Sequence, residues 1–184
     1  MTGKIPQNKT ITPQKPITYG GVKLNENEVQ SKKVVKENGA TRFVISFKNG
    51  STVKYPQQAK HNNAEITSSN YTETKSGREL TANTEISRLF GAEFTGTQYN
   101  PHRDGNYPLD SVSLKGCTNC KVDVSNDVNK NEIGDRVLVF DDYEYGFKAK
   151  NNVIKQDKYD ETYIITSNKD LTIKGEGTHI EKWF

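Results

Sequence analysis

The chain has 184 residues, of which 32% are hydrophobic and 27% charged, and its 26 basic and 23 acidic side chains leave a formal charge of +3. No stretch contains the ~18–20 consecutive apolar residues that cross a bilayer as a helix, so we expect no membrane span. Globular domains usually contain ~45–50% apolar residues with glycine included. The low value disfavours a large single-core α/β enzyme and predicts a polar, strand-rich protein with a thin core.

The positive charge is carried by 21 lysines and only five arginines. Scattered lysines are solvated point charges, whereas planar recognition of phosphates and bases relies on arginine. Nucleic acid is therefore an unlikely partner. The start at Met1 has no basic region followed by an apolar stretch, so no signal peptide is visible. Location stays open among the cytoplasm, a virion and a processed surface protein.

Residues 1–17 hold three of the six prolines and show no hydrophobic periodicity, which predicts a flexible arm. Residues 18–108 form the next predicted unit, a hairpin-containing region with one short helix. Within it, residues 22–24 and 34–35 carry short apolar stretches that are compatible with short strands.

The clearest local signal is a predicted hairpin over residues 42–55. Two β-rich runs flank Asn49-Gly50, the pair that a two-residue type I′ turn favours. That turn pairs Phe47 with Thr52 and places apolar and polar side chains on both faces of the hairpin. Pro56 ends the second strand because it cannot donate a hydrogen bond.

The rest of this region is polar. Residues 64–67 and 70–74 are compatible with short strands. Residues 84–90 predict a helix of one to two turns, with Thr84 as the N-cap and Gly91 as the stop.

From residue 109 to 184, short β-rich segments alternate with turns rich in Asn, Asp, Gly and Lys. This spacing predicts a sandwich, a barrel or a β-solenoid. The expected strands are 111–115, 120–124, 136–140, 151–155, 162–166, 171–174 and 179–183.

Three segments in this region, at 114–124, 150–155 and 167–175, resemble the coils of right-handed parallel β-helix proteins such as pectate lyases and phage tailspikes. The resemblance covers about residues 109–184. It implies a mainly β fold with a short parallel β-helix or solenoid, in which a Gly or Asn turn precedes each strand and coils stack; a β-sandwich is the alternative. The Asp cluster and basic residue of the lyases have no counterpart here, so no catalytic residue is carried over.

Cys117 and Cys120 are three residues apart, a spacing that suits one corner of a zinc site. A complete site needs two more ligands, and His102 is the best further candidate. A redox pair would sit at the start of a helix, whereas residues 121–124 have the pattern of a strand. Small core thiols, with or without a local disulfide, are the favoured interpretation, so no metal and no cofactor is expected.

Residues 98–108 predict a long loop closed by prolines. Loops of this kind present binding groups from a rigid sheet. The binding candidates in it are Tyr99, His102, Arg103, Asp104 and Tyr107.

A second candidate cluster interleaves acids and tyrosines: Asp141, Asp142, Tyr143 and Tyr145. Two such acids would suit glycoside cleavage, and tyrosines beside acids also suit sugar stacking. Nucleotide-binding, hydrolase and metalloprotease motifs are absent.

The sequence therefore favours a non-enzymatic bacterial or phage structural or recognition module. It would bind a protein partner or a surface glycan, as a homo-oligomer or part of a larger assembly. The first alternative is a small polysaccharide-cleaving enzyme. The second is a phage anti-defence or immunity-type inhibitor that acts by surface binding.

Overall fold

The computed structural model describes residues 19–57, 60–68, 83–96, 110–124, 136–144, 146–156, 161–175 and 178–182. The predicted mainly-β class is confirmed. The helices in the described ranges are two 3₁₀ segments, η2 (Tyr19–Gly21) and η3 (Glu26–Glu28). The expected arm over 1–17 and the strand over 70–74 lie outside these ranges.

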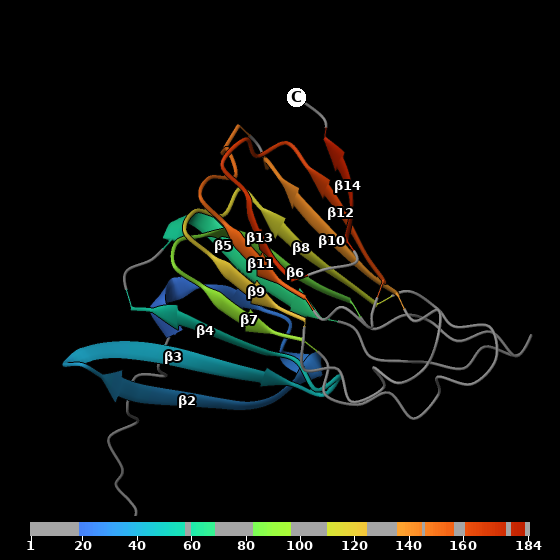
Figure 1. Cartoon of the computed structure of the whole chain (residues 1–184). Coiled ribbons are helices and arrows are strands. Elements are labelled where there is room, and N and C mark those ends of the chain that lie inside the picture. Colours follow the sequence, from blue (N-terminus) through green and yellow to red (C-terminus); the bar gives the residue numbers. More distant parts are fainter. Residues whose placement is uncertain are drawn as a thin grey trace, which may run out of the picture.

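The strands form two sheets of seven, here called sheet A and sheet B (Figure 1). Neither sheet closes on itself, since the first and last strands in each order are not paired with one another. Sheet A has the order β1 (Lys23–Leu24), β5 (Lys60–Ser68), β6 (Asn83–Leu89), β8 (Asp110–Lys115), β10 (Arg136–Asp142), β12 (Glu161–Thr166), β14 (Thr178–Lys182). Sheet B has the order β13 (Thr172–Lys174), β11 (Val153–Lys155), β9 (Lys121–Asp123), β7 (Glu93–Thr95), β4 (Thr52–Pro56), β3 (Ala40–Phe47), β2 (Val29–Glu37).

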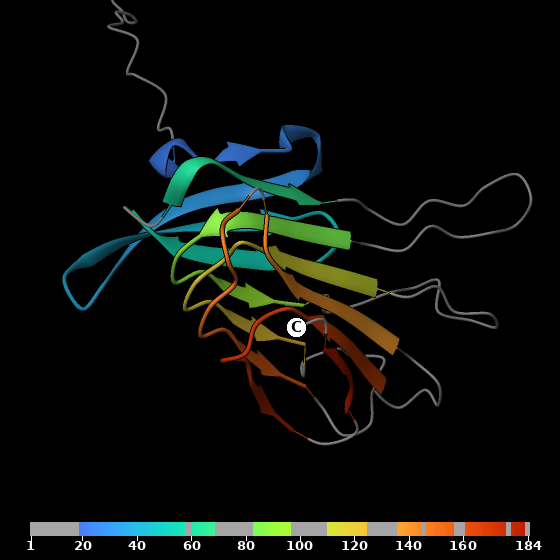
Figure 2. The ribbon, with the colours of Figure 1, turned by 90° about the horizontal axis from the view of Figure 1, so that it is seen from above.

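Strand direction changes along the chain. In sheet B, β2, β3, β4 and β7 pair antiparallel, and in sheet A β5 pairs antiparallel with β6. From β6 onward, successive strands alternate between the two sheets, and every neighbouring pair within a sheet is parallel (Figure 2). All seven strands expected between 109 and 184 are present, with ends within two residues of the predicted bounds.

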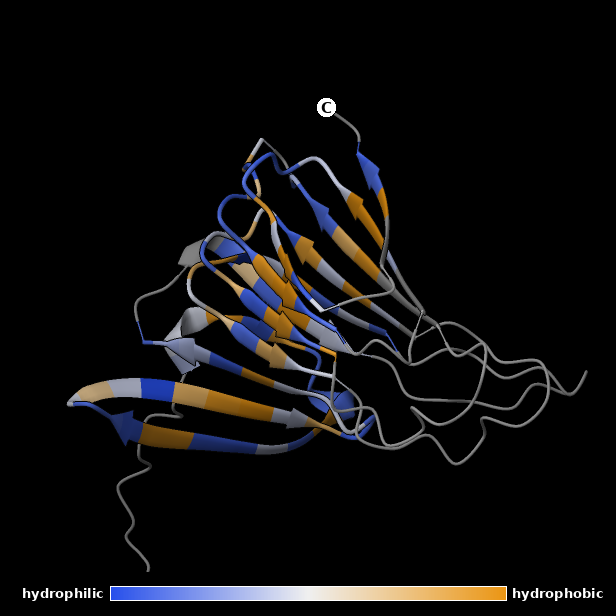
Figure 3. Cartoon of the chain, viewed as in Figure 1, coloured by the Kyte–Doolittle hydropathy of each residue, from blue (hydrophilic) through white to orange (hydrophobic). Residues whose placement is uncertain are grey.

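The core lies between the two sheets, because alternate side chains of both point inward and pack in one cluster (Figure 3). Ile86 and Leu114 enter it from sheet A, and Phe94, Val122 and Ile154 enter it from sheet B. Each outward face consequently consists of the intervening, mainly polar side chains.

The hairpin prediction has the correct strands and the wrong register. Ser46 pairs with Thr52, one residue away from the predicted pairing. The loop has three residues instead of two: the Phe47 N–H donates to the Ser51 carbonyl at 2.8 Å, and Gly50 takes a φ of +91°. A one-residue shift moves every side chain to the other face. The observed register therefore gathers the apolar side chains of both strands on the core side.

The predicted helix at 84–90 is wrong, because this segment is strand β6. Ile86 and Leu89 are both fully buried, three residues apart, which imitates a helical spacing. Arg88 causes this spacing: its φ of +60° interrupts the alternation of the strand and turns Leu89 inward. Pairing with β5 and β8 outweighs the local preference.

The turns that lead from sheet A to sheet B are stacked. Thr118 forms parallel bridges to Phe90 on one side and Lys150 on the other. The residue after each bridge position (Gly91, Asn119, Asn151) has a positive φ, the region that Gly and Asn tolerate best. The same backbone conformation therefore recurs in three successive turns.

Candidate binding groove on sheet A

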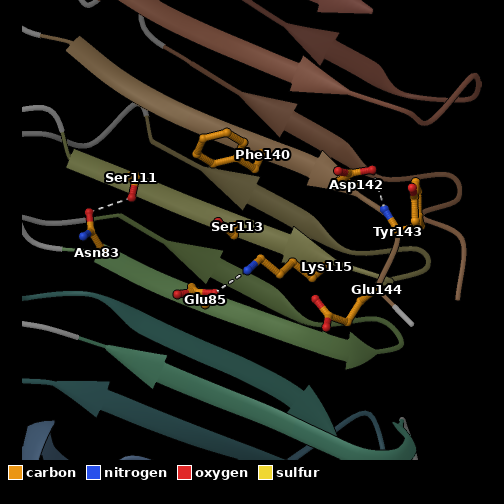
Figure 4. A pocket seen from close by; sticks show the side chains of 9 residues that line it. All are labelled: Asn83, Glu85, Ser111, Ser113, Lys115, Phe140, Asp142, Tyr143 and Glu144. Atoms are coloured by element: carbon orange, nitrogen blue, oxygen red, sulfur yellow. Dashed lines mark hydrogen bonds and ion pairs between the residues drawn. The ribbon is translucent and has the colours of Figure 1, made fainter. Parts of the chain in front are cut away.

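A groove of about 330 Å³ lies on the outer face of sheet A. It crosses three parallel strands, in which Glu85, Ser113 and Phe140 occupy the same register position on β6, β8 and β10. The groove is lined by Asn83, Glu85, Ser111, Ser113, Lys115, Phe140, Asp142, Tyr143 and Glu144 (Figure 4).

Paired polar groups form the part of the groove on β6 and β8. The Ser111 hydroxyl donates to Oδ1 of Asn83 at 2.6 Å. Lys115 Nζ lies 2.7 Å from a carboxylate oxygen of Glu85. These contacts restrain the four side chains along this side of the groove.

Aromatic rings stand at the opposite side of the groove, on β10 and the turn after it (Figure 4). Tyr143 is 61% exposed, which is unusual for so large a side chain. Its backbone N–H donates to Oδ1 of Asp142 at 2.8 Å, and the Ser167 hydroxyl donates to the same oxygen at 2.6 Å. The two reciprocal backbone hydrogen bonds between Glu144 and Phe147, each 2.9 Å, close the turn that carries the ring.

The groove carries an excess of negative charge. Glu85, Asp142 and Glu144 contribute three carboxylates against the single ammonium of Lys115. The Glu85–Lys115 pair is neutral overall, so the Asp142 and Glu144 carboxylates dominate the potential on the aromatic side.

Asp141, which the sequence places among the binding candidates, points into the core and is fully buried. It accepts hydrogen bonds from Asn152 Nδ2 at 2.7 Å and from the Thr166 hydroxyl at 3.0 Å. Loss of hydration on burial raises the pKa of this carboxyl, while the hydrogen bonds from Asn152, Asn168 and Thr166 act in the opposite direction. Asp141 is thus a structural residue, out of reach of a ligand in the groove.

Cys117 and Cys120 are both free and fully buried in the core. Asn152 ties their turn to the next one, donating to the Cys117 carbonyl and accepting from the Cys120 N–H. Burial, and secondarily the neighbouring Cys120 thiol, raise the pKa of Cys117 well above its usual value. A thiol with so high a pKa is a poor nucleophile.

No group of three His, Cys, Asp or Glu side chains in the described ranges comes together in a way that could hold a metal ion. His102, the further zinc candidate, lies outside those ranges, as do Tyr99, Arg103, Asp104, Tyr107 and Tyr145. No helix in the described part of the chain is both long and apolar enough to span a bilayer.

The structure thus keeps two sequence candidates, Asp142 and Tyr143, at the groove. The groove residues of β6 and β8 are not predicted from the sequence, where their only signal is the alternation of small polar side chains with apolar ones, as in Ser111–Lys115. That alternation indicates a solvent-exposed face of a strand, but it does not show which strands lie side by side.

No protein family, curated protein or solved structure was found to match this chain.

Proposed function

We propose that the protein is a non-enzymatic recognition module that binds a glycan in the groove on sheet A. The observation that carries this proposal is an exposed aromatic ring, Tyr143, opposite a row of restrained hydrogen-bonding groups on parallel strands. Sugar rings offer one apolar C–H face and a rim of hydroxyl groups. A stacking surface beside fixed donors and acceptors complements both.

The charge of the groove narrows the class of glycan. The Asp142 and Glu144 carboxylates would repel uronic acids or sialic acids and would accept hydrogen bonds from hydroxyl or amino groups. The expected ligand is therefore a neutral or amino sugar chain.

We also infer that the parallel part of the fold is a short β-solenoid. Strands alternate between the sheets from β6 to β14, and the stacked turns at Thr118 repeat one conformation. In such a stack the groove crosses successive coils, so a sugar chain would lie across the strands and meet β6, β8 and β10 in turn.

Assembly with a second copy is part of the proposal. β13 and β14 end their sheets and pair on one side only among the described strands. Ile180 on β14 is 46% exposed at this end. Exposed strand edges tend to pair with another chain. Light scattering should therefore detect a dimer or larger species, and Ile180→Lys should shift it toward the monomer; a wild-type monomer at all concentrations would refute the assembly.

The test of the groove is a screen of immobilised glycans, followed by titration of those that bind. Tyr143→Ala should weaken binding about three- to tenfold, the value of one lost aromatic contact. Tyr143→Phe is the matched control, because it retains the ring and should retain most of the affinity. Equal binding by wild type and Tyr143→Ala would refute the groove as the site.

The two alternatives would give different results. An enzyme would release reducing ends from a bound polysaccharide, and Asp142→Asn or Glu144→Gln would abolish that release at unchanged thermal stability. An inhibitor would capture a host protein at fixed stoichiometry and would be indifferent to glycans.

A further inference from the structure

The outer face of sheet B carries a second hollow of about 250 Å³, on β7, β9, β11 and β13. Three of its lining side chains are the lysines Lys121, Lys155 and Lys174, which we call the lysine strip. Val153 and the acids Glu93 and Asp123 are the neighbouring outward residues. All three lysines are exposed.

Basic side chains at the other end of the same sheet form ion pairs, whereas those of the lysine strip do not in the part of the chain that the structure describes. On β3 and β4, Arg42 lies 2.9 Å from Glu93, and Lys54 lies 2.9 Å from Glu37. Within the described residues, none of the three ammonium groups of the strip forms an ion pair or a hydrogen bond. Glu93, the acid at the edge of the hollow, is already engaged with Arg42.

Two of these lysines also face each other. Lys155 and Lys174 are register partners on adjacent parallel strands, whose backbones lie about 4.8 Å apart. Like charges at such positions destabilise a sheet. Lys121 is one strand further, beside Val153, so the three charges form a compact group around an apolar centre. Two acids are register partners of strip lysines on the other side: Asp123 of Lys155 and Glu93 of Lys121.

We propose that the lysine strip is a second binding site, for a flexible acidic polysaccharide whose regularly spaced carboxylate groups bridge Lys121, Lys155 and Lys174. The anions would remove the repulsion between Lys155 and Lys174, and Val153 would contact the ring between two charged groups. The strip is independent of the groove on sheet A, since the two lie on opposite outward faces.

The dimensions favour a single sugar chain over a nucleic acid. The strands β9, β11 and β13 have three residues each, a width of about 10 Å. Duplex DNA is bound through about 6–10 phosphate contacts, for which three lysines facing two acids are too few. Lysine also provides point charges without the planar fork that reads phosphates and bases.

The test uses the full chain and the double variant Lys155→Thr/Lys174→Thr, with Lys33→Thr/Lys36→Thr as the matched control. The control removes the same charge from exposed positions on β2, in the same sheet. Polygalacturonate supplies carboxylates, inorganic polyphosphate supplies phosphates, and dextran is the neutral polymer; binding is titrated at low and at physiological salt.

We expect wild type to bind polygalacturonate and not dextran, with affinity that falls as salt rises. The affinity of the strip variant should fall about tenfold. The affinity of the control variant should fall less than about threefold.

Three results would overturn the inference: no binding of polygalacturonate, whether or not polyphosphate binds; equal losses in both double variants; or tighter binding of duplex DNA than of polygalacturonate. A Tyr143→Ala variant that still binds the polyanion separates this site from the groove. Failure of either site would therefore leave the other unaffected.

Discussion

The interior of the protein has two parts, an apolar end filled by large side chains and a polar end that buries a carboxyl group. Between β3, β4 and β6 it is filled by large apolar side chains, among them Phe43, Phe47, Tyr55, Ile86 and Leu89, each at most 4% exposed. Polar side chains are buried at both ends. At the apolar end they are neutral: Asn49, Ser51, Ser68, Thr84 and Ser87. Around β10 to β13 the buried polar set is Asp141, Asn152, Gln156, Thr166 and Asn168, and it includes the acid Asp141.

The two ends are stabilised mainly by different interactions. Apolar burial contributes about 25 cal/mol per Å² and requires no particular orientation. The polar end depends on hydrogen bonds such as the 2.7 Å contact between Asn152 and Asp141, and a buried polar group that loses its partner costs about 1–3 kcal/mol. We therefore expect the apolar end to supply most of the stability and the polar end to be sensitive to geometry and pH.

The largest effect should come from the apolar end. Phe47→Ala removes a ring that is 1% exposed, and the free energy of unfolding should fall by about 3–5 kcal/mol. Val34→Ala, at a position 44% exposed on β2, is the control and should change little. Urea denaturation of both variants measures the difference, and similar losses would contradict the assignment of the main core.

The next effect concerns the turn after β13. Gly175 has a φ of +119°, and a Cβ there would collide with the carbonyl oxygen of Gln156. Gly175→Ala should lower the free energy of unfolding by about 3 kcal/mol through backbone strain and this clash. Native-state hydrogen exchange should show faster opening of β13 and β14 than of β3. If hydrogen exchange became faster to the same extent in all strands, the two parts of the interior would unfold together and not independently.

Asp141→Asn tests the polar network directly. An amide cannot accept hydrogen bonds at both positions as the carboxylate does from Asn152 and Thr166, so we expect a loss of about 2 kcal/mol at pH 7.

The pH dependence of this variant has a defined sign. The folded-state pKa of Asp141 is raised above the value of 3.8 for a free side chain, so the folded protein binds more protons in the interval between the two values. The contribution of this carboxyl to stability therefore falls as pH rises from about 3.8 to its folded pKa, and is constant above it. Urea titrations at several pH values should show this slope in wild type and not in Asp141→Asn; parallel profiles would contradict a raised pKa.

The smallest effect should come from the surface near the apolar end. The hydrogen bond from Lys54, followed by the charges of Lys54 and Arg42, lowers the pKa of Glu37 below its usual value of 4.5. Glu37→Gln should lower the melting temperature only slightly at pH 7, because both groups are solvated. The deficit should disappear as pH falls through the lowered pKa, since the carboxylate of wild type is then protonated. If the melting temperature of Glu37→Gln were still lower than that of wild type at pH 2, the difference would come from packing and not from the charge of Glu37.

Sequence analysis predicts strands well where turn residues bracket a β-rich segment, as at 136–140 and 162–166. It fails where one residue changes the local period. Arg88 gives β6 a helical spacing, and a third loop residue shifts the hairpin at Ser46 and Thr52. Neither the positive φ of Arg88 nor the three-residue loop can be recognised from the neighbouring residues, because pairing with other strands determines both.

The groove was predictable only in part for the same reason. Asp142 and Tyr143 stand next to each other in the sequence, so an acid beside an aromatic ring is visible there. Asn83 and Ser111 meet only because β6 and β8 pair in parallel register. That contact joins segments 28 positions apart, the difference between 111 and 83, and no spacing rule identifies it.

The alternation between sheets has a consequence for how the chain tolerates change in length. The segments that lead from sheet B back to sheet A span residues 96–109, 124–135, 156–160 and 175–177, hence 14, 12, 5 and 3 residues. Parallel pairing in sheet A is retained across all four. Insertions or deletions in the two longer segments should therefore leave the strands in place, and the protein should serve as a scaffold on which evolution or a designer can exchange segments of different length.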